Sequence, residues 1–169
     1  EFDQKKNQKQ IIDTINSIKL SPWSGEEKLI RNNSSYAGMI KSIDKSLGKI
    51  IEALKVMKQF ENTIIVFTSD HGGLSNRGNK RPLATSNYPL RAGKGHLYEG
   101  GIRIPHFVFW KDKINNGWTD HQIIGMDHLL SLINLTNLVP FNDLPKIDGR
   151  SYADVLLGKD PEYPDRSLF

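Results

Sequence analysis

The clearest pattern along the chain is a stripe of apolar residues between positions 36 and 60. Apolar side chains recur there at steps of three and four, and lysines and acidic residues fill many of the positions between them. This spacing places the apolar residues on one face of a single α-helix. The stripe consists of Tyr36, Met39, Ile40, Ile43, Leu47, Ile50, Ile51 and Leu54. Because such a stripe usually packs on a sheet or another helix, we expect it to be part of the core.

Two short apolar runs follow the predicted helix, at residues 63–68 and 104–110. The first run is β-branched and does not alternate with polar residues, which favours a strand buried on both faces, as in a parallel sheet. A long helix that leads directly into such a strand is typical of an α/β fold. The stretch between the two runs is long, irregular and rich in glycine and proline, and a loop of this kind is often functional.

The beginning of the chain carries weaker signals. Four isoleucines between positions 11 and 18 predict a short helix that ends near Leu20, and residues 24–27 indicate a loop. We therefore predict a polar lead-in over residues 1–35 and an α/β domain over residues 36–169.

Three further elements are expected in the last third of the chain. They are a short strand at residues 122–125, a helix at residues 127–134 and a helix at residues 151–157. Asp127 is in position to cap the first of these helices, and Gly158 is in position to close the second.

The composition fits one folded domain, or two small ones at most. The chain has 169 residues, of which 37% are hydrophobic and 25% charged. The net charge of +4 comes without a dense basic run among aromatic residues, which favours a solvated surface over a nucleic-acid interface. The absence of cysteine excludes disulfides, cysteine zinc ligands and a cysteine nucleophile within these residues. The apolar runs are far shorter than the ~20 residues of a membrane-spanning helix.

A first candidate for chemistry stands where the strand at residues 63–68 should end. Asp70 and His71 come directly after it and are followed by two glycines. Ligands in open α/β sheets bind beyond the carboxyl ends of the strands, and a carboxylate beside an imidazole there could hold a metal ion. Spacing alone leaves open the alternative that Asp70 caps a loop and His71 is a surface histidine.

A second candidate lies at residues 90–105. This segment contains four glycines and five side chains that can contact an anion, namely Arg91, Lys94, His96, Tyr98 and Arg103. Lys94 stands between two glycines, so the loop could present its ammonium group to a sulfate or phosphate oxygen. Glu99 and Arg103 are four residues apart and could pair with each other. The composition fits a flexible, solvated basic loop equally well.

Together the two segments resemble the sulfatase family of the alkaline-phosphatase superfamily. Residues 68–72 are similar to the family's Thr-Ser-Asp-(Asn/His)-Gly metal motif, and residues 93–105 to its Gly-Lys-Gly-x-x-Tyr-Glu-Gly-Gly-x-Arg-x-Pro motif. Flanking segments agree with the resemblance, which covers about residues 36–169. They are residues 36–50, 127–135 and 148–158.

The resemblance implies a fold and a set of roles. The fold would be a portion of an alkaline-phosphatase-like sandwich, with a mainly parallel sheet flanked by helices. Asp70 and His71 would be two ligands of a divalent cation, usually Ca²⁺ and less often Mg²⁺. Lys94 would bind the sulfate oxygens and stabilise charge during catalysis, and His96 would be a substrate contact. Glu99 and Arg103 would be scaffold for the loop.

Three features of the family pattern are missing from this sequence. The (Cys/Ser)-x-Pro-x-Arg motif, from which the formylglycine nucleophile is made, does not occur, nor does the adjacent Asp-Asp pair of metal ligands. A small C-terminal antiparallel subdomain would also follow residue 169. The resemblance therefore implies the later part of a sulfatase catalytic domain, with formylglycine expected upstream and no turnover by this chain alone.

Several functional alternatives remain open at this level. They are a phosphodiesterase or phosphonate hydrolase of the same superfamily, a binding protein derived from a sulfatase without its nucleophile, and a nucleic-acid module using Arg77, Lys80, Arg81, Arg91 and Lys94. For a sulfatase, the partners would be a sulfated small molecule or glycan and the remainder of the sulfatase chain. Frequent Lys, Asn and Ile are typical of an AT-rich bacterial genome, and the family implies a periplasmic or secreted location.

Overall fold

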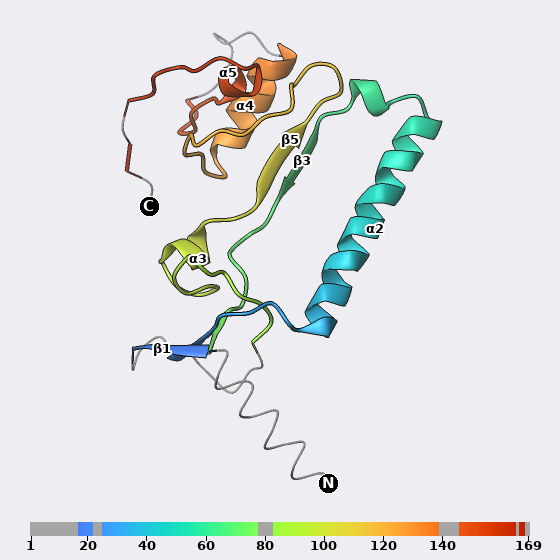
Figure 1. The fold of residues 1–169 in the computed structure, drawn as a ribbon. Helices are drawn as coiled ribbons and strands as arrows, with labels where there is room; N and C mark the ends of the chain where they lie inside the picture. The colour runs from blue at the N-terminus through green and yellow to red at the C-terminus, as the bar shows by residue number, and fades with distance from the viewer. Residues whose placement is uncertain (1–16, 22–24, 78–82, 139–145, 165, 168–169) are drawn as a thin grey trace. The chain divides into compact units, whose positions relative to one another are not determined.

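The computed structural model describes residues 17–21, 25–77, 83–138, 146–164 and 166–167 (Figure 1). The chain divides into two compact units. Unit 1 consists of Glu1–Lys58 and Val66–Phe107, and unit 2 of Gln59–Ile65 and Val108–Phe169. In the described part, no helix combines the length and the apolar character needed to cross a membrane.

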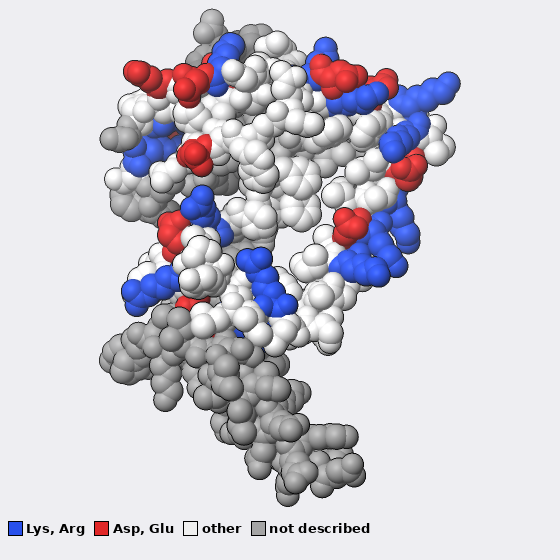
Figure 2. Space-filling model, viewed as in Figure 1, with Lys and Arg blue, Asp and Glu red and all other residues white. Residues whose placement is uncertain are grey.

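The predicted long helix is present as α2, Ser34–Val56. It begins at Asn33, whose side-chain Oδ1 accepts a hydrogen bond from the Tyr36 N–H at 2.9 Å and so caps the first turn. Its polar face carries charges of both signs (Figure 2). The expectation that its apolar stripe is core is wrong, because no residue of α2 is buried. Met39 and Ile50 are 62% and 57% exposed, since no described element packs closely on this face.

Unit 1 contains a small antiparallel sheet where the sequence predicted a helix end and a loop. Its strands are β1 (Ser17–Ser21), β2 (Gly25–Lys28) and β4 (Asn76–Arg77), in the order β1-β2-β4. The segment around residues 17–20 is therefore a strand and not the end of a helix, and residues 25–27 are not a loop. The third strand comes from about 50 residues further along the chain, and such a distant partner is invisible to local periodicity. The rest of the predicted first helix lies outside the described residues.

The two predicted apolar strands are confirmed as β3, Ile65–Thr68, and β5, His106–Phe109. The expectation that the first of them is buried on both faces is wrong, because no residue of β3 is buried. They pair in a two-stranded sheet (Figure 1). The rings of Phe67 and Phe107 stack on it with centroids 5.1 Å apart. A short 3₁₀ helix, η1 (Phe60–Asn62), precedes β3. The strand expected at residues 122–125 is wrong, because these described residues form no strand.

Unit 2 is organised around a buried carboxylate at the start of α4, Asp127–Thr136. Asp127 is 1% exposed and accepts hydrogen bonds from the backbone N–H groups of Ile124 and Arg150 at 3.0 and 2.8 Å. The Arg166 guanidinium forms an ion pair with the same carboxylate. Asp127 is thus not the N-cap of α4, which is Met126, and instead joins three segments of unit 2.

The pKa of Asp127 reflects two opposing effects. Burial by itself raises the pKa of this carboxyl, but the hydrogen bonds from Arg166, Arg150 and Ile124 outweigh it and hold the pKa below its ordinary value.

The second predicted helix is confirmed as α5, Ala153–Leu156, and Gly158 follows it with a φ of +80°. Tyr152, at the N-cap of α5, donates its backbone N–H to the Ser131 hydroxyl at 2.9 Å. This contact joins α5 to α4.

Candidate functional site

The two motif segments lie against each other in unit 1. The Gly72 N–H donates to the Gly101 carbonyl at 2.8 Å, and the Lys94 N–H donates to the Gly73 carbonyl at 3.1 Å. These bonds join segments that are 21 to 29 residues apart, by subtraction of the residue numbers. The metal-motif loop that follows β3 and the loop that carries Lys94 therefore form one loop cluster.

Glycines make this close approach possible. A Cβ atom at Gly72 would lie 1.8 Å from the Gly100 carbonyl oxygen, and one at Gly93 would lie 2.2 Å from the Gly73 carbonyl oxygen. Both distances are far inside van der Waals contact, and the neighbours are backbone atoms that have little room to move. The two loops thus meet backbone to backbone, and the motif glycines are required by packing.

Asp70 and His71 point to the same place at the carboxyl end of β3. The His71 Nε2 lies 3.2 Å from an Asp70 carboxylate oxygen, which confirms the expected proximity of the two side chains. The His71 Nδ1 lies 2.9 Å from the Gly72 carbonyl oxygen, which can only accept a hydrogen bond. Both ring nitrogens thus lie near oxygen acceptors, Nδ1 near the Gly72 carbonyl and Nε2 near the Asp70 carboxylate. A carboxylate beside an imidazole nitrogen can share a proton or a metal cation with it.

Among the residues that the structure describes, the set of donors around Asp70 and His71 is incomplete for Ca²⁺. The described residues contain no group of three or more His, Cys, Asp or Glu that could hold a metal ion. Ca²⁺ takes six to eight oxygen ligands, whereas Asp70 and His71 supply one carboxylate and one imidazole. The pair fits two positions of a larger ligand set and not a complete site.

We expect this chain alone to bind Ca²⁺ weakly or not at all. Titration of the isolated chain with CaCl₂ in a calorimeter should give a dissociation constant weaker than ~10 µM, because most of the ligands that Ca²⁺ requires are missing. Asp70→Ala serves as the control and should give the same trace. A constant tighter than ~10 µM that is lost in Asp70→Ala would mean that these residues complete the site by themselves.

Lys94 lies on a loop whose backbone conformation is fixed by hydrogen bonds at Ala92. Ala92, two residues earlier, is 0% exposed and has a φ of +60°. This left-handed conformation costs a residue with a Cβ atom about 1–2 kcal/mol. The Ala92 carbonyl accepts hydrogen bonds from the Ser75 hydroxyl at 2.8 Å and from the Asn87 amide at 2.9 Å, which offset that cost. Lys94 and Gly95, the latter with a φ of +89°, are exposed beyond this anchored turn.

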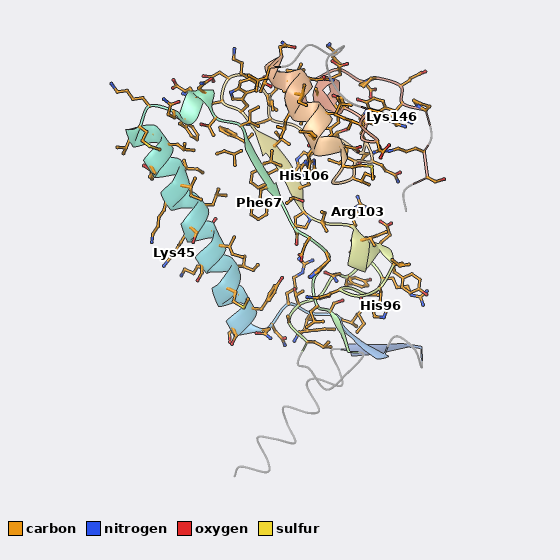
Figure 3. All side chains as sticks on the ribbon, turned by 180° about the vertical axis from the view of Figure 1, so that it is seen from behind. Lys45, Phe67, His96, Arg103, His106 and Lys146 are labelled. Carbon is orange, nitrogen blue, oxygen red and sulfur yellow. The ribbon has the colours of Figure 1, made fainter. Side chains whose placement is uncertain are left out.

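The other charged groups of the segment make contacts within it. The Arg91 guanidinium lies over the Tyr98 ring, 3.8 Å from its centroid. Arg103, the C-cap of α3 (Glu99–Ile102), pairs with Glu99 at 3.8 Å, the pairing that their four-residue spacing allows. His96 and Arg103 both belong to this segment (Figure 3), and the backbone N–H of His96 donates to the Gly93 carbonyl at 3.1 Å.

Two residues of the loop cluster escaped the sequence analysis. Asn87 and Ser75 connect the metal-motif loop to the turn before Lys94, through hydrogen bonds to each other and to backbone atoms. Their partners are up to 17 residues away along the chain. No local periodicity could have identified them, although a polar residue inside a long functional loop is a weak signal.

A family model described as Sulfatase matches residues 1–137 of the chain. The chain belongs to the sulfatase family. It is 34% identical to N-acetylgalactosamine-6-sulfatase from Canis lupus familiaris over 139 residues, which is 79% of this chain and 25% of that protein. It is 33% identical to the uncharacterized sulfatase YdeN from Escherichia coli (strain K12), over 79% of this chain and 23% of that protein. The chain thus spans about a quarter of the length of these relatives.

Solved structures agree with this assignment. The crystal structure of Ps i-CgsB in complex with k-i-k-neocarrahexaose is similar with a TM-score of 0.59 and 35% identity, over 71% of this chain and 26% of that one. A second crystal structure of Ps i-CgsB gives a TM-score of 0.60 and 34% identity, over 73% and 26% of the two chains. The predicted fold class, a portion of an alkaline-phosphatase-like sandwich, is confirmed.

Proposed function

We propose that this chain is the part of a sulfuric ester hydrolase that contributes two metal ligands and the sulfate-binding lysine. Asp70 and His71 are the ligands, Lys94 is the catalytic cation and His96 is a substrate contact. The observation that carries the proposal is the hydrogen bond from the Lys94 N–H to the Gly73 carbonyl, because it seats the lysine loop against the loop of the metal ligands. An anion between a cation and a metal site is the arrangement that sulfate transfer requires.

The chain's own residues do three things in this proposal. The Gly72 carbonyl oxygen lies 2.9 Å from the His71 Nδ1 and would accept its proton when Nε2 acts as the metal ligand. The anchored turn at Ala92 fixes the base of the lysine loop before substrate arrives, so that little reorganisation is needed during the reaction. The Lys94 ammonium is a compact charge that stabilises the developing negative charge on the sulfate oxygens.

The remaining machinery belongs to the rest of the sulfatase. Formylglycine would supply the nucleophile. Ligands outside this chain would complete the coordination of Ca²⁺, or less often of Mg²⁺. Two observations support the proposal, namely the quarter of the relatives' length that the chain spans and the exposed apolar stripe of α2. A stripe of this kind needs a covering element, and the rest of the domain provides one. The chain alone would then be inactive.

A sulfated glycan is the substrate class that we favour. One related structure holds a neocarrahexaose, and one relative is named as a sulfatase of N-acetylgalactosamine. Sulfated glycans outside the cytoplasm fit a periplasmic or secreted location.

The activity can be tested on the intact sulfatase that contains this chain. We expect release of inorganic sulfate from p-nitrophenyl sulfate and from sulfated oligosaccharides, with little hydrolysis of bis(p-nitrophenyl) phosphate. Preferential hydrolysis of the phosphodiester would contradict the proposal in favour of the phosphodiesterase alternative. Binding of sulfated oligosaccharide without any hydrolysis would instead support a binding protein that lacks the nucleophile.

A further inference from the structure

Asn87 makes more contacts between the two motif loops than any other side chain for which hydrogen bonds are described there. Its Oδ1 accepts from the Gly73 N–H at 3.2 Å. Its Nδ2, which carries two hydrogens, lies within hydrogen-bonding distance of three acceptors, namely the Gly73 carbonyl at 2.9 Å, the Ala92 carbonyl at 2.9 Å and the Ser75 hydroxyl at 3.0 Å. A single amide therefore holds Gly73, three residues after Asp70, and Ala92, two residues before Lys94.

The surroundings of this side chain are shaped for an amide. A Cβ atom at Gly73 would lie 2.9 Å from the Asn87 Oδ1, and one at Gly93 would lie 2.7 Å from its Nδ2. Glycine at both positions leaves the room that the amide occupies. Aspartate would place a carboxylate against two carbonyl oxygens, and an apolar residue would leave those carbonyls and an N–H group without this partner. Only a side chain with both a donor and an acceptor satisfies the two loops together.

Asn87 affects the position of Lys94 through its hydrogen bond to the Ala92 carbonyl. Two hydrogen bonds, from Asn87 and from the buried Ser75 hydroxyl, hold this carbonyl while Ala92 has a positive φ. The chain then passes through Gly93 to Lys94, whose N–H returns to the same Gly73 carbonyl that Asn87 contacts. The position of the Lys94 backbone relative to the metal-motif loop thus depends on the Asn87 amide.

We propose that Asn87 is a positioning residue that sets the place of Lys94 relative to Asp70 and His71. The inference rests on the proposed sulfatase function of these three residues. In this proposal Asn87 acts by positioning Lys94 and does not itself contact the substrate. Losing the amide would let the lysine loop shift, and a shift of about 1 Å is enough to reduce an enzymatic rate strongly.

A double-mutant cycle in the intact sulfatase tests this role. With p-nitrophenyl sulfate as substrate, Asn87→Ala should lower kcat/KM by about 10-fold in the wild-type background. In the Lys94→Ala background the same substitution should lower it by less than about 2-fold, because the group that Asn87 positions is already absent. Non-additivity of this kind is not expected from a general loss of stability.

Asn33→Ala is the matched control, because Asn33 also holds two backbone partners in unit 1 but caps α2. It should lower the Tm by a few degrees at roughly unchanged kcat/KM. If Asn87→Ala does not fold, Ser75→Ala replaces it in the cycle. That variant loses the hydroxyl bonded to Ala92 and Asn87, and we expect a loss of about 3-fold that also vanishes without Lys94.

Equal losses in both backgrounds would overturn the positioning role, and so would full activity of Asn87→Ala. Full activity of Lys94→Ala has a different meaning, because it would refute the proposed function itself. The two failures are therefore distinguishable in one set of measurements.

Discussion

Replacing Lys94 by alanine in the intact sulfatase should lower kcat/KM by about 10²-fold or more. Removing one charged group that stabilises the transition state typically costs about 3 kcal/mol, because mobile water does not replace a charge that is held in place before the reaction. Lys94 is exposed, and its backbone is anchored to the loop of Asp70 and His71. Steady-state kinetics with p-nitrophenyl sulfate measure the effect directly.

Two further variants define what this result means. Lys94→Arg should restore activity only in part, because a planar guanidinium does not occupy the place of a compact ammonium. Lys45→Ala, on the exposed face of α2 (Figure 3), should leave activity unchanged. Equal activity of Lys94→Ala and Lys45→Ala would identify the loop as ordinary solvated surface and remove the sulfate site from the proposal.

Replacing Asp127 by alanine should destabilise unit 2 by about 3 kcal/mol or more, the usual cost of leaving a partly buried charge without its partner. The change removes the ion pair with Arg166 and leaves the N–H groups of Ile124 and Arg150 without their acceptor. Hydrogen exchange followed by mass spectrometry should show the loss of protection in peptides of α4 and α5. Peptides of α2, in unit 1, should keep their exchange rates.

Asp154→Ala is the control for this experiment. Asp154 pairs with Lys159 on the exposed side of α5, so its removal should cost less than about 0.5 kcal/mol.

The loss of stability in Asp127→Ala should also depend on pH. Because the folded pKa of Asp127 lies below its unfolded value of about 3.9, its contribution is present above that pH and is lost as the pH falls through the folded pKa. A stability difference between wild type and Asp127→Ala that stays constant down to pH 2 would contradict this account.

The sequence allowed the elements with strong local patterns to be predicted. The long helix, the two apolar strands and the short helix before Gly158 follow from periodicity and terminal residues, and the structure contains all four. The antiparallel sheet of β1, β2 and β4 was missed because its last strand joins from a distant segment. The burial of the α2 stripe was predicted wrongly, because amphipathicity shows that a face needs a partner but not whether this chain contains it.

The candidate site also contains residues that the sequence identified and residues that it did not. Asp70, His71 and Lys94 could be selected from motif order and from their place beside glycines, and their loops lie together in the structure. The contacts of Asn87 in the site, like those of Asp127 in unit 2, could not be predicted, since each side chain bonds to several backbone groups that are far apart in the sequence. A side chain that bonds to backbone atoms leaves no complementary residue type for a sequence pattern to detect.

The backbone-to-backbone contact between the motif loops has a consequence for how this surface can diversify. Its closest approaches are made at glycines, where a Cβ atom would meet main-chain atoms, so they do not depend on the side chains at the exposed positions of the loops. Outward-facing positions on the same loops, such as Leu97 and Tyr88, are 92% and 63% exposed. They can therefore exchange size, polarity or charge without disturbing the junction beneath them.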